Sequence, residues 1–222
     1  MMDGRLPRVS TSDALVTLLR DEVLNGVRPL GSRLTEAELV QAYGVSRHSI
    51  RIALNDLASL GLVVLKPHKG ARVRQMAARD IEDLYRVRWL LESEAIAHAA
   101  IEPATWEDLG RRVTRLEQLP ADAPWSVVAL ADWDFHHEMV IGTGNTRLVR
   151  THRLLEAETL LSFIQGAPED DVRAVVASHV SLLEAIRSGD SYVATEALRD
   201  HLEESMRSLV TRLRPGAVAP KR

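Results

Sequence analysis

Apolar residues recur every three to four positions over most of the 222-residue chain, a spacing typical of helices. In the amino-terminal part this pattern predicts three helices, over 12–25, 36–43 and 47–60. Residues that favour helix starts open or precede these helices, and glycines follow them. The starts are Ser12, Thr35 and Ser46, and the glycines are Gly26, Gly44 and Gly61.

Two short apolar runs follow the third predicted helix, at 62–65 and 71–74. The basic turn Lys66-Pro67-His68-Lys69-Gly70 separates them, so the two runs predict a β-hairpin. Two helices joined by a short glycine-containing turn form a helix-turn-helix. The hairpin that follows is the wing of a winged helix-turn-helix.

From Ala78 onward the chain shows helical spacing and no β-rich stretch. The predicted helices span 79–101, 103–118, 125–142, 146–165, 168–188 and 190–213. Helices without a sheet bury their apolar faces against one another, which favours an antiparallel bundle. We therefore expect a mainly α protein. Its predicted parts are a winged helix-turn-helix domain over 1–76, an all-α antiparallel helical bundle over 77–214, and a disordered tail over 215–222.

The basic residues are concentrated in the amino-terminal part. Residues 1–75 contain eleven Lys and Arg against seven Asp and Glu, a net charge of +4, whereas the remainder of the chain carries −7. Six basic residues and one acidic residue lie between Arg47 and Arg74. A basic domain beside an acidic one indicates a polyanionic partner such as nucleic acid, although chance clustering would give the same charges.

The composition excludes several other classes of protein. With 45% hydrophobic and 27% charged residues, the chain is an ordinary globular protein. It has no cysteine, which excludes a disulfide scaffold, a thiolate metal site and a cysteine nucleophile. No apolar run approaches the roughly 20 residues of a membrane helix, and the start of the chain lacks the apolar stretch of a secretory signal. We expect a cytoplasmic protein that does not contact the membrane.

The third predicted helix carries Arg47 and Arg51 on one side, because residues four apart share a helix face. Arginine side chains suit guanine edges and phosphates, and hydroxyl groups suit phosphates. Candidate DNA contacts on this helix and on the wing are therefore Ser46, Arg47, His48, Ser49, Arg51, His68, Lys69 and Gly70. The alternative is a helical cap whose arginines are only solvated.

This amino-terminal part resembles the winged helix-turn-helix of GntR-family transcription regulators. The resemblance rests on Leu34-Thr35-Glu36-Ala37-Glu38-Leu39, Tyr43-Gly44-Val45-Ser46-Arg47-His48-Ser49-Ile50-Arg51, Leu60-Gly61-Leu62-Val63 and Lys69-Gly70-Ala71-Arg72-Val73. It implies that Arg47 and Arg51 contact DNA and that Arg33 contacts a phosphate. His48 and Ala37 depart from residues common in the family, so the resemblance leaves the operator sequence open.

Four polar residues interrupt the apolar faces of three helices in the bundle. Asp132 and His136 are four apart in the helix over 125–142, His179 lies in the next-to-last helix, and His201 lies in the last. A buried carboxylate is unfavourable unless it is paired or bound to a metal. One carboxylate and three imidazoles suit a divalent transition metal, with zinc favoured and nickel or manganese as alternatives. The competing interpretation is a hydrogen-bonded Asp–His network without a metal.

The carboxy-terminal part, over most of 80–213, resembles the FCD ligand-binding domain of FadR-type GntR regulators. The resemblance rests on Arg88-x-x-x-Glu92, Asp132-x-x-Phe135-His136, Gly144-Asn145, His179 and His201. It implies that the Asp and the three His hold a metal ion, and that the domain senses a small organic acid rather than an acyl-CoA. An octahedral ion with four protein ligands would keep positions for water or an effector carboxylate.

Two further polar residues have two interpretations each. Arg88 lies on an apolar stripe with Leu84 and Leu91, where it could bind an acidic effector or form a structural ion pair. His152 lies with Leu148 and Leu155, where it could support the metal ligands or fill the core.

We expect a transcription regulator, a repressor rather than an enzyme, that acts as a homodimer on palindromic double-stranded operator DNA. A small carboxylate effector bound at the metal would lower operator affinity through linkage. The main alternative is a metal-dependent hydrolase of small molecules, because a metal in a histidine-rich site can activate water. A third class, an architectural DNA-binding protein, leaves the Asp–His set unexplained.

Overall fold

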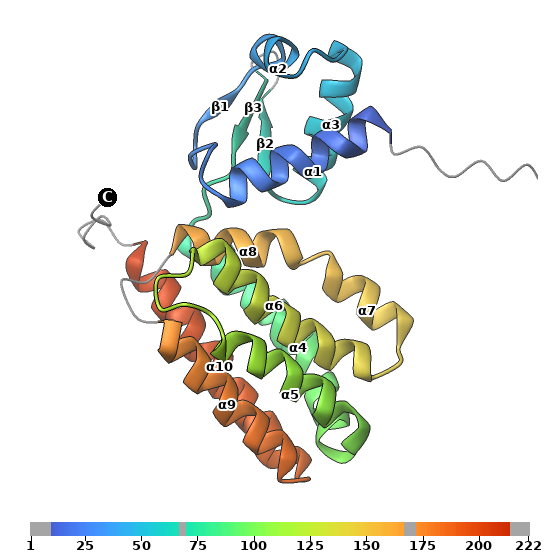
Figure 1. Cartoon of the computed structure of the whole chain (residues 1–222), viewed down its shortest axis with the longest axis vertical. Helices are drawn as coiled ribbons and strands as arrows, with labels where there is room; N and C mark the ends of the chain where they lie inside the picture. Colours follow the sequence, from blue (N-terminus) through green and yellow to red (C-terminus); the bar gives the residue numbers. More distant parts are fainter. Residues whose placement is uncertain (1–9, 67–69, 167–171, 214–222) are drawn as a thin grey trace, which may run out of the picture. The chain divides into compact units, whose positions relative to one another are not determined.

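The computed structural model describes residues 10–66, 70–166 and 172–213 and confirms the mainly α fold. The chain divides into two compact units, Met1–Gln75 and Met76–Arg222, whose elements are drawn in Figure 1. The wing residues His68 and Lys69 and the predicted tail over 215–222 lie outside the described residues.

The amino-terminal unit combines three helices with a small sheet. Its elements are α1 (Thr11–Leu24), β1 (Arg33–Leu34), α2 (Glu36–Tyr43), α3 (Arg47–Ser59), β2 (Val63–Lys66) and β3 (Gly70–Val73). The sheet is antiparallel with strand order β1-β3-β2. The hairpin β2–β3 agrees with the predicted wing. Strand β1 was not predicted, because two residues are too few to show an alternating pattern.

Side-chain caps define where the three helices of this unit begin. The hydroxyl groups of Thr35 and Ser46 accept backbone hydrogen bonds at the starts of α2 and α3, as predicted. The predicted cap Ser12 is wrong. Ser10 caps α1 instead, because its hydroxyl accepts from the Asp13 backbone N–H and the Asp13 carboxylate accepts from the Ser10 backbone N–H.

A single apolar core holds α2 and α3 in the helix-turn-helix. Its fully buried residues include Leu19, Leu34, Leu39, Ile50, Leu57 and Leu62. Ile50 and Leu57 share the inner face of α3 at helical spacing, so the opposite face of this helix points away from the core.

The carboxy-terminal unit is a bundle of helices. They are α4 (Ala78–Ile101), α5 (Pro103–Glu117), α6 (Trp125–Gly142), α7 (Thr146–Arg153), α8 (Glu156–Gln165), α9 (Val172–Arg187) and α10 (Ser191–Arg212). The prediction of a single helix over 146–165 is wrong, because the helix is interrupted at 154–155, between α7 and α8. Backbone bonds from Leu154 to Thr151 and from Leu155 to His152 tighten this corner. Apolar spacing continues across the break and therefore concealed it.

Helix α6 lies at the centre of the bundle and packs against α4, α5, α7 and α8, as Figure 1 shows. Val128, Phe135 and Met139 of α6 are completely buried. Polar side chains on the same face of α6 are therefore enclosed by protein and must find partners there.

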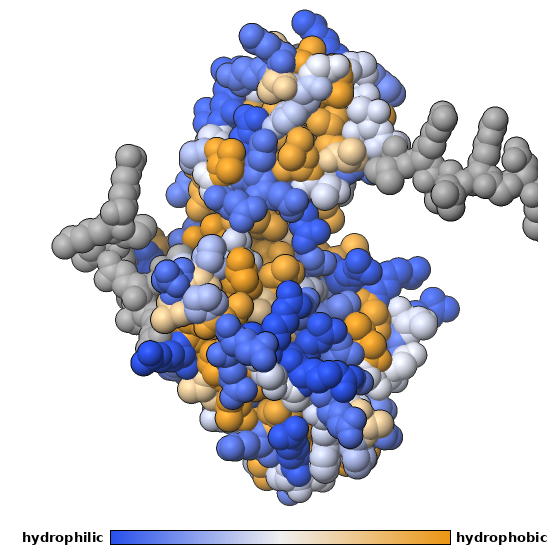
Figure 2. Space-filling model, viewed as in Figure 1, coloured by the Kyte–Doolittle hydropathy of each residue, from blue (hydrophilic) through white to orange (hydrophobic). Residues whose placement is uncertain are grey.

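The outer side of α6 has a different character. On the face shown in Figure 2, hydrophilic residues gather over α5 and α6. Arg112 pairs with Glu138, and Arg115 lies 2.9 Å from Asp134. Ion pairs on the outside of α6 leave its inner face to Asp132 and His136. Within the described residues, none of the helices has the length and apolar character needed to cross a membrane.

Candidate metal centre and DNA-binding surface

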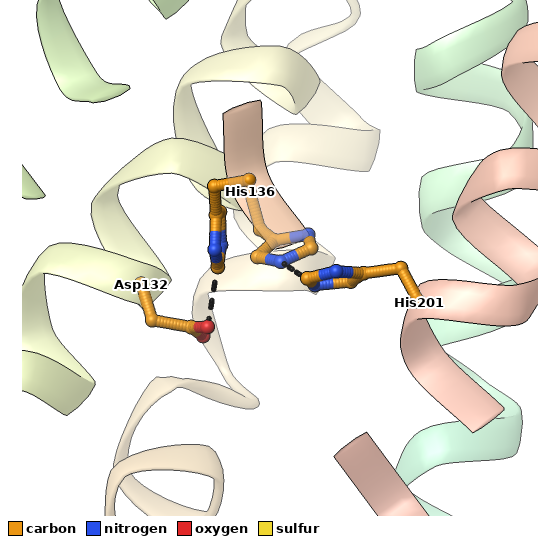
Figure 3. Close-up of side chains that lie close together, drawn as sticks. Asp132, His136 and His201 are labelled. Carbon is orange, nitrogen blue, oxygen red and sulfur yellow. Dashed lines mark hydrogen bonds and ion pairs between the residues drawn. The ribbon is translucent and has the colours of Figure 1, made fainter. Parts of the chain in front are cut away.

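The structure brings Asp132, His136, His179 and His201 together from three helices. Asp132 and His136 lie one turn apart on α6, His179 on α9 and His201 on α10. One ligand atom from each residue lies within 4.8 Å of those of the other three. Nε2 of His136 is 3.1 Å from Nε2 of His201, and Nε2 of His179 is 3.3 Å from Oδ1 of Asp132. Figure 3 shows the side chains of Asp132, His136 and His201 directed into one small space.

The unsatisfied atoms of this cluster fit a cation. His179 donates its Nδ1–H to the backbone oxygen of Val175 at 2.8 Å, which leaves the lone pair of Nε2 facing the cluster. Nε2 of His179 and Oδ2 of Asp132 are buried and have no hydrogen-bond partner in the described structure. Because buried polar atoms without partners are unfavourable, a divalent metal with three nitrogen ligands and one oxygen ligand suits this space.

Two histidines of the cluster, His179 and His201, are held in the neutral form. Burial lowers the pKa of His179 to about 4, although the Asp132 carboxylate acts in the opposite direction. The surrounding protein also desolvates the ring of His201 and lowers its pKa well below the usual value, and His179 and His136 add to this effect. Neutral imidazole is the form that binds a metal.

Glu92 of α4 contacts the cluster, and sequence analysis did not propose it as a site residue. Its Oε2 lies 2.7 Å from Nδ1 of His136, although the contact lacks the alignment of a hydrogen bond, and within residues 10–66, 70–166 and 172–213 neither atom has a hydrogen-bond partner. Its Oε1 accepts from Nε of Arg88 at 2.8 Å and lies 3.2 Å from Nε2 of His152. The available signal was the Arg88-x-x-x-Glu92 spacing on an apolar stripe.

Arg88 forms the structural ion pair that was one of its two interpretations. Its side chain is only 1% exposed, and its guanidinium carbon lies 4.9 Å from the ring centre of Tyr85. Its Nη2 is buried and has no hydrogen-bond partner in the described structure. The ion pair with Glu92 therefore accounts for Nε but not for Nη2.

His152 is connected to the cluster through Glu92. It is completely buried, and its ring stacks on Trp133 with ring centres 4.4 Å apart. Its Nδ1 lies 3.0 Å from Nδ1 of His137. His152 therefore fills the core and contacts Glu92, and its support of the metal ligands stays a prediction.

A cavity of about 280 Å³ lies beside Asp132 and His201. Phe163, Val175 and Leu209 form apolar parts of its wall. Its polar lining also includes Ser178, Glu204, Ser205, Ser208 and Arg212. The cavity has room for a small organic molecule that reaches the proposed metal ligands.

On α3 of the amino-terminal unit, Arg47, His48 and Arg51 are exposed. The Arg51 side chain is 69% exposed, and its Nε lies 3.6 Å from Glu36. Such an exposed ion pair is weak and can exchange for a phosphate or a base edge. These three side chains are therefore accessible to solvent, and their contact with DNA stays a prediction.

Other predicted DNA contacts have structural roles in this unit. The Ser46 hydroxyl accepts from the Ser49 backbone N–H, so Ser46 caps α3, and the Ser49 hydroxyl lies 2.9 Å from the Ser46 hydroxyl. Gly70 has φ +80°, and a Cβ there would lie 2.6 Å from the backbone oxygen of Leu34. Gly70 therefore permits β1 to pair with β3. Arg33 is exposed on β1.

A winged helix-turn-helix joined to a helical domain with an enclosed polar cluster defines a DNA-binding transcription regulator. Comparison with protein families agrees: residues 11–73 match the bacterial regulatory proteins of the gntR family, and residues 83–204 match the FCD domain. The chain belongs to the GntR family of transcription regulators and carries an FCD domain. It is a regulator and not an enzyme, and the hydrolase alternative has no support among these matches.

Individual relatives are similar over nearly the whole chain. The probable D-xylose utilization operon transcriptional repressor of Paenarthrobacter nicotinovorans is 27% identical and covers 89% of this chain and 88% of its own length. The galactonate operon transcriptional repressor of Escherichia coli K12 is 25% identical and covers 90% of this chain and 97% of its own. A putative GntR regulator from Rhodococcus sp. RHA1 shares the fold, with a TM-score of 0.79, 24% identity, and coverage of 91% of this chain and 99% of its own.

Proposed function

We propose that this chain is a repressor that binds palindromic operator DNA as a homodimer and is released by a small organic acid bound at a metal. The names of two relatives, repressors of a xylose and a galactonate operon, support repression. A two-fold dimer matches a palindromic site, because one winged helix-turn-helix reads only a half-site. We also propose a cytoplasmic location, which is where a bacterial regulator meets chromosomal DNA.

The observation that carries this proposal is the cluster of Asp132, His136, His179 and His201, with its unsatisfied atoms, beside a cavity. These four residues would hold the ion, and zinc is the favoured metal with nickel or manganese as alternatives. A bound divalent ion supplies a Lewis-acidic centre to which a carboxylate can coordinate.

The charges around the four-residue cluster favour an anionic effector. Asp132 and Glu92 are balanced in part by Arg88, so a divalent ion leaves one positive charge in excess when these groups carry their usual charges. Arg88 also retains the unpartnered Nη2, which can attract an acid group while Nε holds Glu92. We propose a small carboxylate as the effector.

Repression is relieved through linkage. The effector would bind more tightly to the conformation of the dimer that cannot bind the operator. Effector binding then lowers operator affinity, and operator binding lowers effector affinity by the same factor. Binding to the folded protein alone also stabilises it, by about 2.7 kcal/mol at a hundredfold excess over Kd.

A thermal-shift screen tests this function. Monocarboxylates, dicarboxylates and sugar acids are added to the purified protein before and after chelation, with elemental analysis of both samples. We expect metal in the untreated protein and acids that raise its Tm only while the metal is present. Hits that are neutral or cationic, or that keep their effect after chelation, would show that the metal does not take part in sensing.

A further inference from the structure

We propose that Glu92 is a positioning residue of the metal centre, which holds His136 in the orientation and tautomer that the ion requires. This inference rests on the proposed metal function and adds a residue from α4 to a cluster otherwise supplied by α6, α9 and α10. Glu92 would not touch the ion. It would act through the ring of His136.

The first step is the position of the His136 proton. Nε2 of His136 faces His201, in the space shared by the ligand atoms. To bind a metal through Nε2, a neutral imidazole must carry its proton on Nδ1. The atom beside that position is Oε2 of Glu92, at 2.7 Å. A carboxylate that accepts a hydrogen bond from this Nδ1–H makes the ring a better ligand and fixes its rotation.

The second step concerns the different contacts of the two carboxylate oxygens of Glu92. Oε1 is occupied by Arg88 and His152, whereas Oε2 has no hydrogen-bond partner among the residues that the structure describes. Contacts from two directions prevent the carboxylate from turning away, and Trp133 holds His152 by stacking. Oε2 therefore stays directed at His136, even though the His136 ring is not turned to form a hydrogen bond with it.

The third step is the charge of Glu92. Its Oε1 accepts from Nε of Arg88 at 2.8 Å, and a buried carboxylate is favourable when it is paired in this way with a guanidinium. The side chain is therefore held as a charged acceptor, although it is completely buried. The simpler alternative is that Glu92 only neutralises Arg88. That role explains the contact between Oε1 and Arg88, but it does not explain why Oε2 lies beside Nδ1 of His136.

The test measures zinc affinity by competition with a chromophoric chelator. Glu92→Gln keeps the size of the side chain but replaces the ionised acceptor with a neutral amide. We expect its Kd for zinc to rise 10- to 100-fold, the range for loss of a partner that supports a metal ligand. The matched control is Glu94→Gln, an exposed carboxylate on the same helix, which should keep the wild-type Kd.

A double variant separates positioning from simple charge pairing. Arg88→Met/Glu92→Gln removes both members of the ion pair and leaves no uncompensated charge. If Glu92 served only Arg88, the double variant would recover the wild-type Kd. We expect it to remain at least tenfold weaker, because His136 still lacks its acceptor. Melting curves of the metal-free proteins by circular dichroism check folding, and Glu92→Asp, which retains the charge but withdraws the oxygen, replaces Glu92→Gln if that variant does not fold.

The possible results distinguish failure of the proposed metal function from failure of the proposed role of Glu92. A wild-type protein that binds no zinc, nickel or manganese would overturn both the proposed function and the role of Glu92. Tight binding by the wild type with unchanged affinity in folded Glu92→Gln, or recovery in the double variant, would overturn only the role of Glu92. Weak binding in both variants, with the control unchanged, would support it.

Discussion

Helices α3 and α6 carry polar pairs at the same spacing and use them in opposite ways. Arg47 and Arg51 lie four apart on α3 and face solvent, whereas Asp132 and His136 lie four apart on α6 and face the core. Exposed arginines lose little hydration on folding and stay available to a partner. The enclosed pair loses its hydration and depends on partners from other helices.

This difference shows that spacing alone does not reveal what a polar pair does. The chemistry of α3 depends on residues close in sequence, which share one exposed face. The chemistry of α6 depends on His179, His201 and Glu92, which three other helices bring to it. Substitutions on α3 should therefore change binding without changing the fold, and substitutions at the α6 cluster should change metal content first.

The largest expected effect is on metal content. His179→Ala/His201→Ala removes two of the four proposed ligands, so we expect the purified variant to contain almost no divalent metal by elemental analysis. Arg47→Ala/Arg51→Ala is the control and should retain the wild-type content. Full metal content in the histidine variant would refute the site.

The next effect is on operator binding. Each of Arg47→Ala and Arg51→Ala should remove about 1–3 kcal/mol of specific binding, measured by fluorescence anisotropy with a labelled operator. Ser59→Ala at the far end of α3 should bind as the wild type does. If the double arginine variant keeps the wild-type affinity, α3 is not the recognition helix.

A smaller effect is expected on the stability of the amino-terminal unit. Gly70→Ala places a Cβ 2.6 Å from the Leu34 backbone oxygen at a residue with φ +80°, which should cost about 1–3 kcal/mol. Urea unfolding followed in this unit should show a lower midpoint, while the metal content remains unchanged. An unchanged midpoint would mean that β1 does not pair with β3 as described.

The smallest effect concerns pH. Burial acts to raise the pKa of Glu22, but hydrogen bonds from Tyr43 and Arg28 outweigh it and hold the pKa below its usual 4.5. Because the folded pKa is lowered, the stabilisation by Glu22 is present above pH 4.5 and is lost as the pH falls through the folded value. The gap in urea midpoint between wild type and Glu22→Gln should therefore close on acidification. A gap that is constant from pH 7 to pH 3 would contradict this ionic role.

The sequence allowed the helix-turn-helix, the hairpin and most helices to be predicted, because caps and apolar spacing are local signals. It did not reveal β1, whose two residues depend on β3, or the corner at 154–155, where the apolar spacing continues. It indicated Asp132, His136, His179 and His201 because each interrupts an apolar face. The Arg88-x-x-x-Glu92 spacing marked Glu92 but did not indicate its contact with His136, because that contact joins two helices and follows from no spacing within either.

The most direct test of the central claim is operator affinity measured with and without the acids that stabilise the protein. Anisotropy titrations are run on the metal-loaded wild type, the chelated wild type and His179→Ala/His201→Ala. The account predicts that the acids weaken operator binding by the metal-loaded wild type and leave the other two samples unchanged. Equal weakening in all three, or no weakening in the metal-loaded protein, would contradict control of DNA binding through the metal centre.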